Sequence, residues 1–118
     1  MRIYISHSAN FDFKKELYTP IRKSELKGDF ILPHERIVKQ YPTKKLFFSE
    51  KCDLVIAEVS YPSTGQGIEL AWANINNIPI ICLHKTTTVY SKSLRLISKK
   101  FIPYKNPVDL LAKIKKII

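Results

Sequence analysis

The chain has 118 residues, 45% hydrophobic and 25% charged, an ordinary composition for one globular domain with one core. It lacks an apolar run near the roughly 20 residues of a membrane-spanning helix and a secretion signal, so we expect a cytoplasmic protein. Two cysteines, Cys52 and Cys82, are too few for a disulfide framework or a zinc site, and we expect both to be buried thiols.

Short apolar segments alternate with helical ones along the chain. We expect strands at residues 2–6, 29–32, 53–59, 79–83 and 100–103. We expect helices at residues 11–18, 20–25 (or a kink at Pro20), 44–51, 68–76, 91–98 and 107–118. Asn10 is the expected N-cap of the first helix and Gly28 the expected C-cap of the segment after Pro20. Cys52 is expected to end a helix and Cys82 to lie in a strand.

This alternation predicts an α/β fold, with a single flavodoxin-like or Rossmann-like domain over residues 1–118. Its five strands would form a parallel sheet in the order 2-1-3-4-5, with helices on both faces. In such sheets the ligand cleft opens at the carboxyl ends of the strands, here where strands 1 and 3 separate. Residues 4–8 and 60–69 would then lie side by side.

Residues 52–72 contain a strand, a turn rich in glycine and the start of a helix. We expect Gly65 and Gly67 in the turn and Glu69 in the first turn of the helix. There the helix dipole and unpaired N–H groups would stabilise an ionised carboxylate. An ionised carboxylate beside a phosphate-sized turn is a candidate nucleophile. Alternatively, Glu69 only caps its helix.

The segment 53–70, DLVIAEVSYPSTGQGIEL, closely resembles the signature of the nucleoside 2-deoxyribosyltransferase superfamily. It is most similar to the branch of 2'-deoxynucleoside 5'-phosphate N-hydrolases. Four further features agree with this resemblance: Tyr4 on the first strand, Pro33-His34 after the second, the 81–83 strand and Ser93 in a short helix.

The resemblance implies an N-glycosidase, either a hydrolase or a transferase, that cleaves the base–sugar bond of a nucleoside 5'-monophosphate. Glu69 would be the nucleophile and form a glycosyl-enzyme ester, as in a retaining glycosidase, and Tyr4 would hold the nucleophile and the sugar. No metal and no other cofactor is expected. The implied substrate-binding residues are Ser6, His7, Ser8, Ser63, Gly65, Gly67 and Ser93. In this family Ser93 would reach the phosphate from the neighbouring subunit, which implies a homodimer.

The chain departs from the family pattern in two places. Lys45 stands where the family has an Asp that works with the departing base, and Asp12, Glu35 or Glu50 could substitute for it. Ser6-His7-Ser8 replaces a turn that contains glycine. These departures leave base specificity open and allow a second interpretation, in which the chain is a catalytically impaired nucleotide-binding module.

Simpler structural roles exist for most of these residues. Ser63 could stabilise its turn, Ser93 could lie in its helix without binding, and Tyr4 could be a core aromatic. His34 suits a loop, and Glu58 suits a salt bridge at the end of its strand. A further alternative comes from residues 5–10, ISHSAN, which resemble the opening of a TIR domain, a fold in which some members cleave NAD.

Positive charge gathers in the last third of the chain, where residues 85–118 carry nine lysines or arginines against the single acid Asp109. Such a segment could attract nucleic acid. However, residues 107–118 place Leu110, Leu111, Ile114 and Ile118 on one helical face and lysines elsewhere, the pattern of an amphipathic surface helix. We therefore favour a solvated face and do not expect a nucleic-acid or membrane partner.

Overall fold

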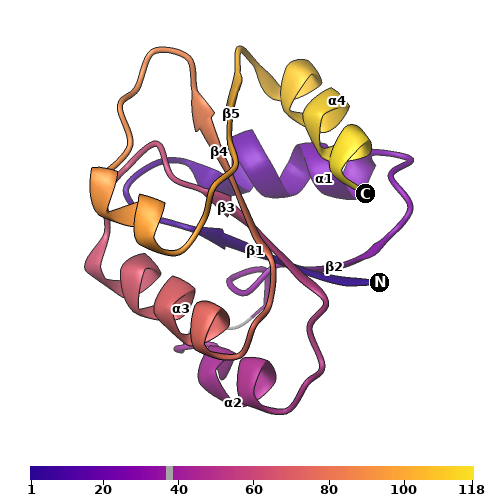
Figure 1. Ribbon diagram of the computed structural model, residues 1–118. Helices are drawn as coiled ribbons and strands as arrows, with labels where there is room; N and C mark the ends of the chain where they lie inside the picture. The colour runs from indigo at the N-terminus through magenta and orange to yellow at the C-terminus, as the bar shows by residue number, and fades with distance from the viewer. Residues whose placement is uncertain (37–38) are drawn as a thin grey trace.

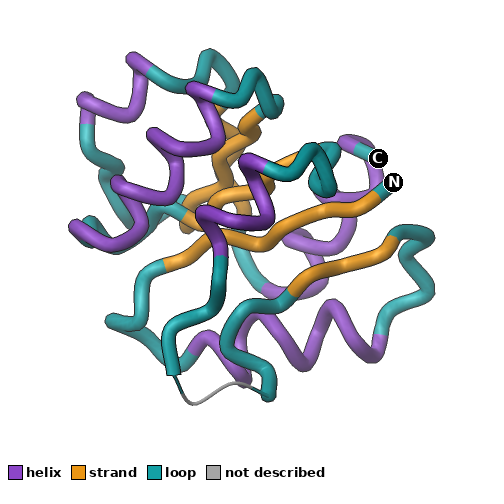
Figure 2. The backbone as a smooth tube through the Cα atoms, turned by 90° about the horizontal axis from the view of Figure 1, so that it is seen from below, coloured by secondary structure: helices purple, strands orange, loops and turns teal. Residues whose placement is uncertain are grey.

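The computed structural model describes residues 1–36 and 39–118 and has a parallel sheet between two layers of helices (Figures 1 and 2). The strands are β1 (Arg2–His7), β2 (Asp29–Ile31), β3 (Leu54–Glu58), β4 (Ile80–Lys85) and β5 (Phe101–Tyr104). The helical segments are η1 (Lys14–Tyr18), α1 (Thr19–Lys23), α2 (Thr43–Phe48), α3 (Thr64–Ile75), η2 (Lys92–Leu96) and α4 (Pro107–Ile117). The strand order is β2-β1-β3-β4-β5 with every pair parallel, which confirms the predicted α/β fold.

Side chains of β1 alternate between two hydrophobic cores, because successive residues of a strand point to opposite faces of the sheet. Ile3 and Ile5 join the core formed with α1 and α4, whereas Tyr4 joins the core formed with α2 and α3. All of β1 after Arg2 is buried. The same alternation places Ser6 on the side of the sheet that α3 covers.

The first helical segment differs from the prediction. Lys14–Tyr18 forms a π-helical turn that runs directly into α1, and Pro20 is the second residue of α1. Asn10 does not cap a helix, because the first helical segment begins at Lys14 with Phe13 at its N-cap position. The helix ends at Ser24, so Gly28 is not its C-cap.

Helix α3 begins four residues earlier than predicted. Ser63 is in an extended conformation, and its Oγ accepts a 3.4 Å hydrogen bond from the backbone N–H of Gln66, so Ser63 is the N-cap. Gly65 and Gly67 therefore lie in the first helical turn rather than in a loop. Glu69 lies in the second turn, and the prediction that it occupies the first turn is wrong.

Helix α2 ends at Phe48, so Cys52 follows the helix rather than ending it, while Cys82 lies in β4 as predicted. Both are free, buried thiols. Within residues 1–36 and 39–118, no helix combines the length and the apolar character that crossing a membrane requires.

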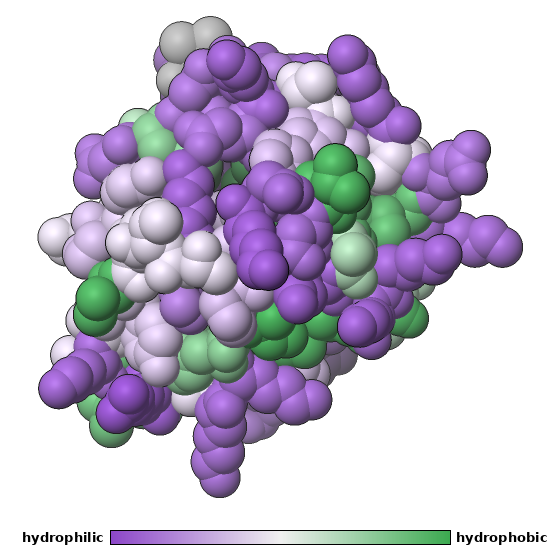
Figure 3. Space-filling model, turned by 90° about the horizontal axis from the view of Figure 1, so that it is seen from above, coloured by the Kyte–Doolittle hydropathy of each residue, from purple (hydrophilic) through white to green (hydrophobic). Residues whose placement is uncertain are grey.

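Helix α4 is amphipathic, as predicted. Leu110 and Ile114 are buried against the sheet, and Lys115 and Lys116 are exposed. Figure 3 shows long hydrophilic side chains that project from the rim of the face seen from above, with hydrophobic surface between them.

Candidate active site

The carboxylate of Glu69 is held by two hydroxyl groups of β1. Tyr4 Oη donates to Oε1 at 3.1 Å, and Ser6 Oγ donates to Oε2 at 3.3 Å. Tyr4 and Ser6 are two residues apart on one strand and therefore face the same helix, α3. The structure thus brings together three of the predicted site residues, two from β1 and one from α3.

A third hydroxyl, that of Thr43 at the start of α2, completes this group. Its Oγ1 lies 2.8 Å from Tyr4 Oη, and Thr43 and Tyr4 are 3% and 0% exposed. Sequence reasoning did not identify Thr43. A threonine at the first position of a short helix has no distinguishing pattern, and only the packing of α2 against α3 brings it to the site.

Burial raises the pKa of Glu69, and hydrogen bonds from Tyr4, Ser6 and Thr43 oppose that rise. This finding corrects the prediction that the helix dipole favours the ionised carboxylate, because Glu69 lies beyond the first turn where free N–H groups act. Burial and the neighbouring Glu69 charge also raise the pKa of Tyr4, so its phenol stays protonated and remains a donor.

A surface pocket of about 370 Å³ lies at the N-terminus of α3. Ser63, Gly67 and Ser93 line it, so Ser93 shares the pocket with Ser63 of its own chain. The backbone N–H of Gly67 donates to the Ser63 carbonyl at 3.0 Å and is not free for a ligand. Gly67 can therefore contribute to the pocket only the space that its missing side chain leaves. A Cβ added at this position would meet no protein atom within 4 Å.

His7 faces the opposite side of the sheet from Tyr4 and Ser6. Its Nε2 lies 2.6 Å from Tyr18 Oη, and its Nδ1 lies 2.8 Å from the carbonyl oxygen of Ser8. Burial lowers the pKa of His7 to about 4, so the ring is neutral at pH 7. The ring also lies 5.5 Å from that of His34, centroid to centroid. His7 is therefore a packed and fully hydrogen-bonded side chain, whatever contact a ligand makes with its backbone.

Glu58 anchors the turn that leads into α3, a role that the sequence did not reveal. The carboxylate is 2% exposed and accepts hydrogen bonds from the Ser60 backbone N–H at 2.6 Å, from Ser60 Oγ at 2.9 Å and from Tyr104 Oη. Among residues 1–36 and 39–118, Glu58 forms no salt bridge, contrary to the prediction. Instead, the Glu58 carbonyl accepts from Gln66 Nε2 at 2.9 Å, which ties the end of β3 to the first turn of α3.

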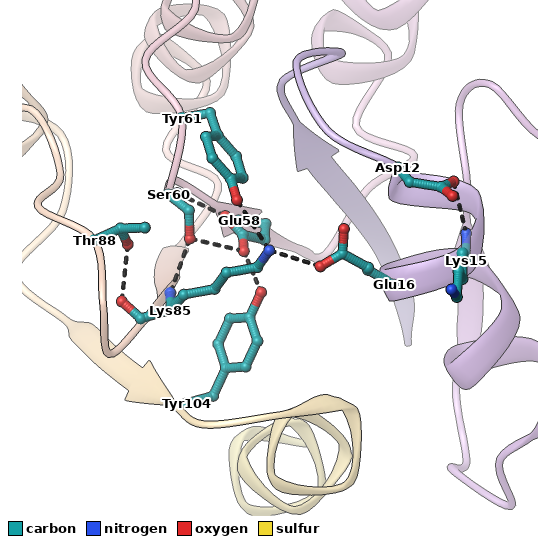
Figure 4. A network of polar contacts seen from close by, with 9 residues as sticks. All are labelled: Asp12, Lys15, Glu16, Glu58, Ser60, Tyr61, Lys85, Thr88 and Tyr104. Carbon is teal, nitrogen blue, oxygen red and sulfur yellow. Dashed lines mark hydrogen bonds and ion pairs between the residues drawn. The ribbon is translucent and has the colours of Figure 1, made fainter.

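Lys85 extends this network toward the surface (Figure 4). Its backbone N–H donates to Ser60 Oγ at 2.8 Å, and its Nζ binds Glu16 at 2.6 Å and Tyr61 Oη at 2.9 Å. Tyr61 stacks on Phe11 with ring centroids 5.1 Å apart. The loops that follow β1 and β3 are therefore joined across the point where these strands separate.

None of the three carboxylates considered from the sequence lies beside Glu69, where it could take the role of the acid that Lys45 replaces. Glu35 forms a two-point salt bridge with Arg22, and Asp12 accepts from the backbone N–H of Lys15. Glu50 is exposed in the turn after α2. Lys45 is also exposed. In the part of the chain that the structure describes, no cluster of three or more His, Cys, Asp or Glu residues could hold a metal ion.

Comparison with known proteins gives local likeness in sequence and global likeness in fold, and no family model matches the chain. Over 35 residues, 30% of this chain, it is 54% identical to a Methanosarcina mazei protein named "Putative 2'-deoxynucleoside 5'-phosphate N-hydrolase 1". Over 34 residues, 29% of this chain, it is 53% identical to a protein of the same name from Syntrophotalea carbinolica. The match spans only 22% and 24% of the lengths of these two proteins.

Among solved structures, the CMP N-glycosidase of Clostridium botulinum has the same fold, with a TM-score of 0.71 and 24% identity. The similarity covers 100% of both chains. The local sequence match agrees with the resemblance to the nucleoside 2-deoxyribosyltransferase superfamily, and the solved structure shows a shared fold.

Proposed function

We propose that the protein is an N-glycosidase that cleaves the base–sugar bond of a nucleoside 5'-monophosphate, with Glu69 as the nucleophile. The observation that carries this proposal is the half-buried Glu69 carboxylate held by Tyr4 and Ser6. Fixed hydroxyl donors orient the carboxylate oxygens and partly offset the cost of keeping the charge out of water. The names of the curated relatives and the N-glycosidase title of the structural neighbour agree with this reaction class.

The chemistry follows the two displacements of a retaining glycosidase. A Glu69 oxygen attacks C1' of the sugar, the C1'–N bond breaks, and the base leaves with the bonding electron pair. A water molecule, or a second base in a transferase, then attacks C1' and loses a proton, which balances the proton that the departed base takes up, and the ester bond to Glu69 breaks. Tyr4 keeps its proton throughout and returns its hydrogen bond to the freed carboxylate. The proposal includes no cofactor, because the nucleophile is a protein carboxylate and the proton that the base takes up is balanced by the one that water loses.

The 5'-phosphate would bind in the pocket at the N-terminus of α3. Ser63 and Ser93 provide hydroxyl donors there, and the helix N-terminus favours an anion. Gly67 would border the phosphate without a side chain, and Gly65 precedes it in the same helical turn. Ser6, His7 and Ser8 would border the sugar from the end of β1. A homodimer remains a prediction, which light scattering on the purified protein would test.

The decisive experiment is an HPLC assay for free base from the eight common ribonucleoside and deoxyribonucleoside 5'-monophosphates. We expect the parent protein to release base from at least one of them and Glu69→Gln to release none. Glu25→Gln is the matched control, because Glu25 is an exposed glutamate of the α1–β2 loop. Equal activity of Glu69→Gln and the parent would contradict the proposal.

A second candidate is a module that binds a nucleotide without cleaving it. It is favoured because every hydrogen-bond donor to Glu69 is a hydroxyl, and because Lys45, at the position of the family's acid, is exposed. This module would gain thermal stability from a monophosphate and release no base. Including NAD in the same assay tests the TIR-like alternative, for which free nicotinamide is the diagnostic product.

A further inference from the structure

The hydroxyl of Thr43 is linked to Glu69 through a single buried side chain. Thr43 Oγ1 lies 2.8 Å from Tyr4 Oη, which in turn lies 3.1 Å from Glu69 Oε1. Thr43 starts α2, Tyr4 lies in β1, and Glu69 lies in α3, so the three groups come from three separate elements (Figure 1). Phe47 of α2 packs its ring against the ring of Tyr4, centroids 5.0 Å apart, which fixes α2 beside the phenol.

Counting protons shows what Thr43 contributes. Tyr4 has one hydroxyl proton, and when this proton points to Glu69 the hydrogen between Thr43 and Tyr4 must come from Thr43. The hydrogen bond from Tyr4 Oη to Glu69 Oε1 uses the Tyr4 proton, so Thr43 Oγ1 is the donor to Tyr4 Oη. One proton then lies between Thr43 and Tyr4, and the Tyr4 proton points to the carboxylate. Without the Thr43 proton, the phenol oxygen would lose its donor.

We propose that Thr43 is a positioning residue that keeps the phenol proton of Tyr4 directed at the Glu69 carboxylate. This inference rests on the proposed function, because the carboxylate matters as a nucleophile only if the chain cleaves a glycosidic bond. Thr43 acts through Tyr4, so it supports the ionised carboxylate against the effect of burial.

The test compares Thr43→Val, which keeps the shape and removes the proton, with Thr43→Ser, which keeps the proton. Protein with 13C-labelled glutamate side chains is titrated by NMR, and the Glu69 signal is identified by its loss in Glu69→Gln. We expect Thr43→Val to move the Glu69 midpoint up by about 0.5–1 pH unit, since one hydrogen bond to a charged group weakens. Thr43→Ser should titrate like the parent, as should Thr87→Val, a control in the exposed loop after β4.

Activity supplies a second, independent measurement. With a cleaved monophosphate as substrate, Thr43→Val should shift the acidic limb of the kcat/KM profile upward by the same interval, and Thr43→Ser should restore it. In the background of Tyr4→Phe, Thr43→Val should have little further effect, because the link between them is already broken. A purely structural role would instead lower activity equally at every pH and add to the effect of Tyr4→Phe.

The two proposals fail separately. If no nucleotide is cleaved, the proposed function is wrong, while the NMR titration still decides whether Thr43 supports the Glu69 charge. An unchanged Glu69 midpoint in a folded Thr43→Val protein would overturn the inference, even if the enzyme is active. A Thr43→Ser protein that titrates like Thr43→Val would overturn it equally, because the shift would then follow the change of shape.

Discussion

Tyr4 and Glu69 are 65 residues apart in the chain, and a 3.1 Å hydrogen bond joins the Tyr4 phenol to Glu69 Oε1. This bond connects the first strand of the sheet to the helix that follows the third strand. It also gives Tyr4 two roles, one for its ring and one for its hydroxyl. The ring belongs to the core, as its alternation with Ile3 and Ile5 suggests, but its hydroxyl belongs to the candidate active site.

Replacing Tyr4 by Phe should impair catalysis more than it impairs folding. The loss of a hydrogen bond to a charged group, about 1.5–3 kcal/mol, corresponds to a loss of roughly 10- to 100-fold in kcat/KM if the bond is made in the transition state. Because Tyr4 lowers the pKa of Glu69, its removal should also move the acidic limb of the pH profile to higher pH. Steady-state base release between pH 4 and pH 8 measures both effects. An unchanged profile would exclude Tyr4 from the site.

Replacing Glu69 by Gln should stabilise the protein at neutral pH while abolishing its activity. Burial raises the pKa of Glu69 in the folded state, so folded protein binds a proton more readily than unfolded protein, and stability falls as pH rises through the interval between the two pKa values. Gln never ionises and avoids this loss. We expect the melting temperature of Glu69→Gln to exceed that of the parent by more at pH 8 than at pH 4. The reverse order would show that Glu69 is stabilised in its charged form.

Replacing Glu58 by Gln should destabilise the turn before α3. The carboxylate now accepts hydrogen bonds from the Ser60 backbone N–H, Ser60 Oγ and Tyr104 Oη. The amide of Gln would direct an N–H group at one of these three donors. An unsatisfied buried group costs about 1–3 kcal/mol, measurable by urea unfolding. Tyr104→Phe removes a single donor and should cost less. Equal stability of Glu58→Gln and the parent would mean that the network contributes nothing net.

Replacing Ser63 by Ala tests the pocket at the N-terminus of α3. Loss of the N-cap should cost about 0.5–2 kcal/mol of stability. Loss of the hydroxyl should also raise KM for the monophosphate, with no change for the nucleoside that lacks the phosphate, so the nucleoside is an internal control. An equal change for both substrates would place the phosphate elsewhere.

Gly67→Ala separates the two possible reasons for a glycine in this helix. An added Cβ meets nothing within 4 Å, and Ala is favoured over Gly in a helix by about 0.8–1 kcal/mol, so the variant should be more stable. If the phosphate lies against Gly67, the same variant should bind the monophosphate more weakly. A stable variant with unchanged KM would assign Gly67 no part in binding.

The strand order could be predicted because strands alternate with helices along the chain. The central strand could be predicted because it is a short, β-branched apolar run, and the last helix because its apolar residues recur with period 3.6. The start of α3 could not. Ser63 is followed by Gly65 and Gly67, and a segment rich in serine and glycine is typical of a loop. The sequence therefore did not indicate that Ser63 is the N-cap. Glu58 and Thr43 were missed for a different reason. Their partners, Tyr104 and Tyr4, are 46 and 39 residues away in the chain, and only the assembled sheet brings them together.

The distances along the chain that separate Tyr4, Thr43 and Glu69 also bear on folding. A fragment ending before α3 lacks the nucleophile, and one starting after β1 lacks both donors of that strand, so no local unit can hold a nucleotide by these groups. Ligand binding and global folding are consequently linked. A nucleotide present at 100 times its Kd would add about 2.7 kcal/mol to the unfolding free energy. The nucleotide concentration in the cell would then affect how long the protein stays folded as well as how fast it works.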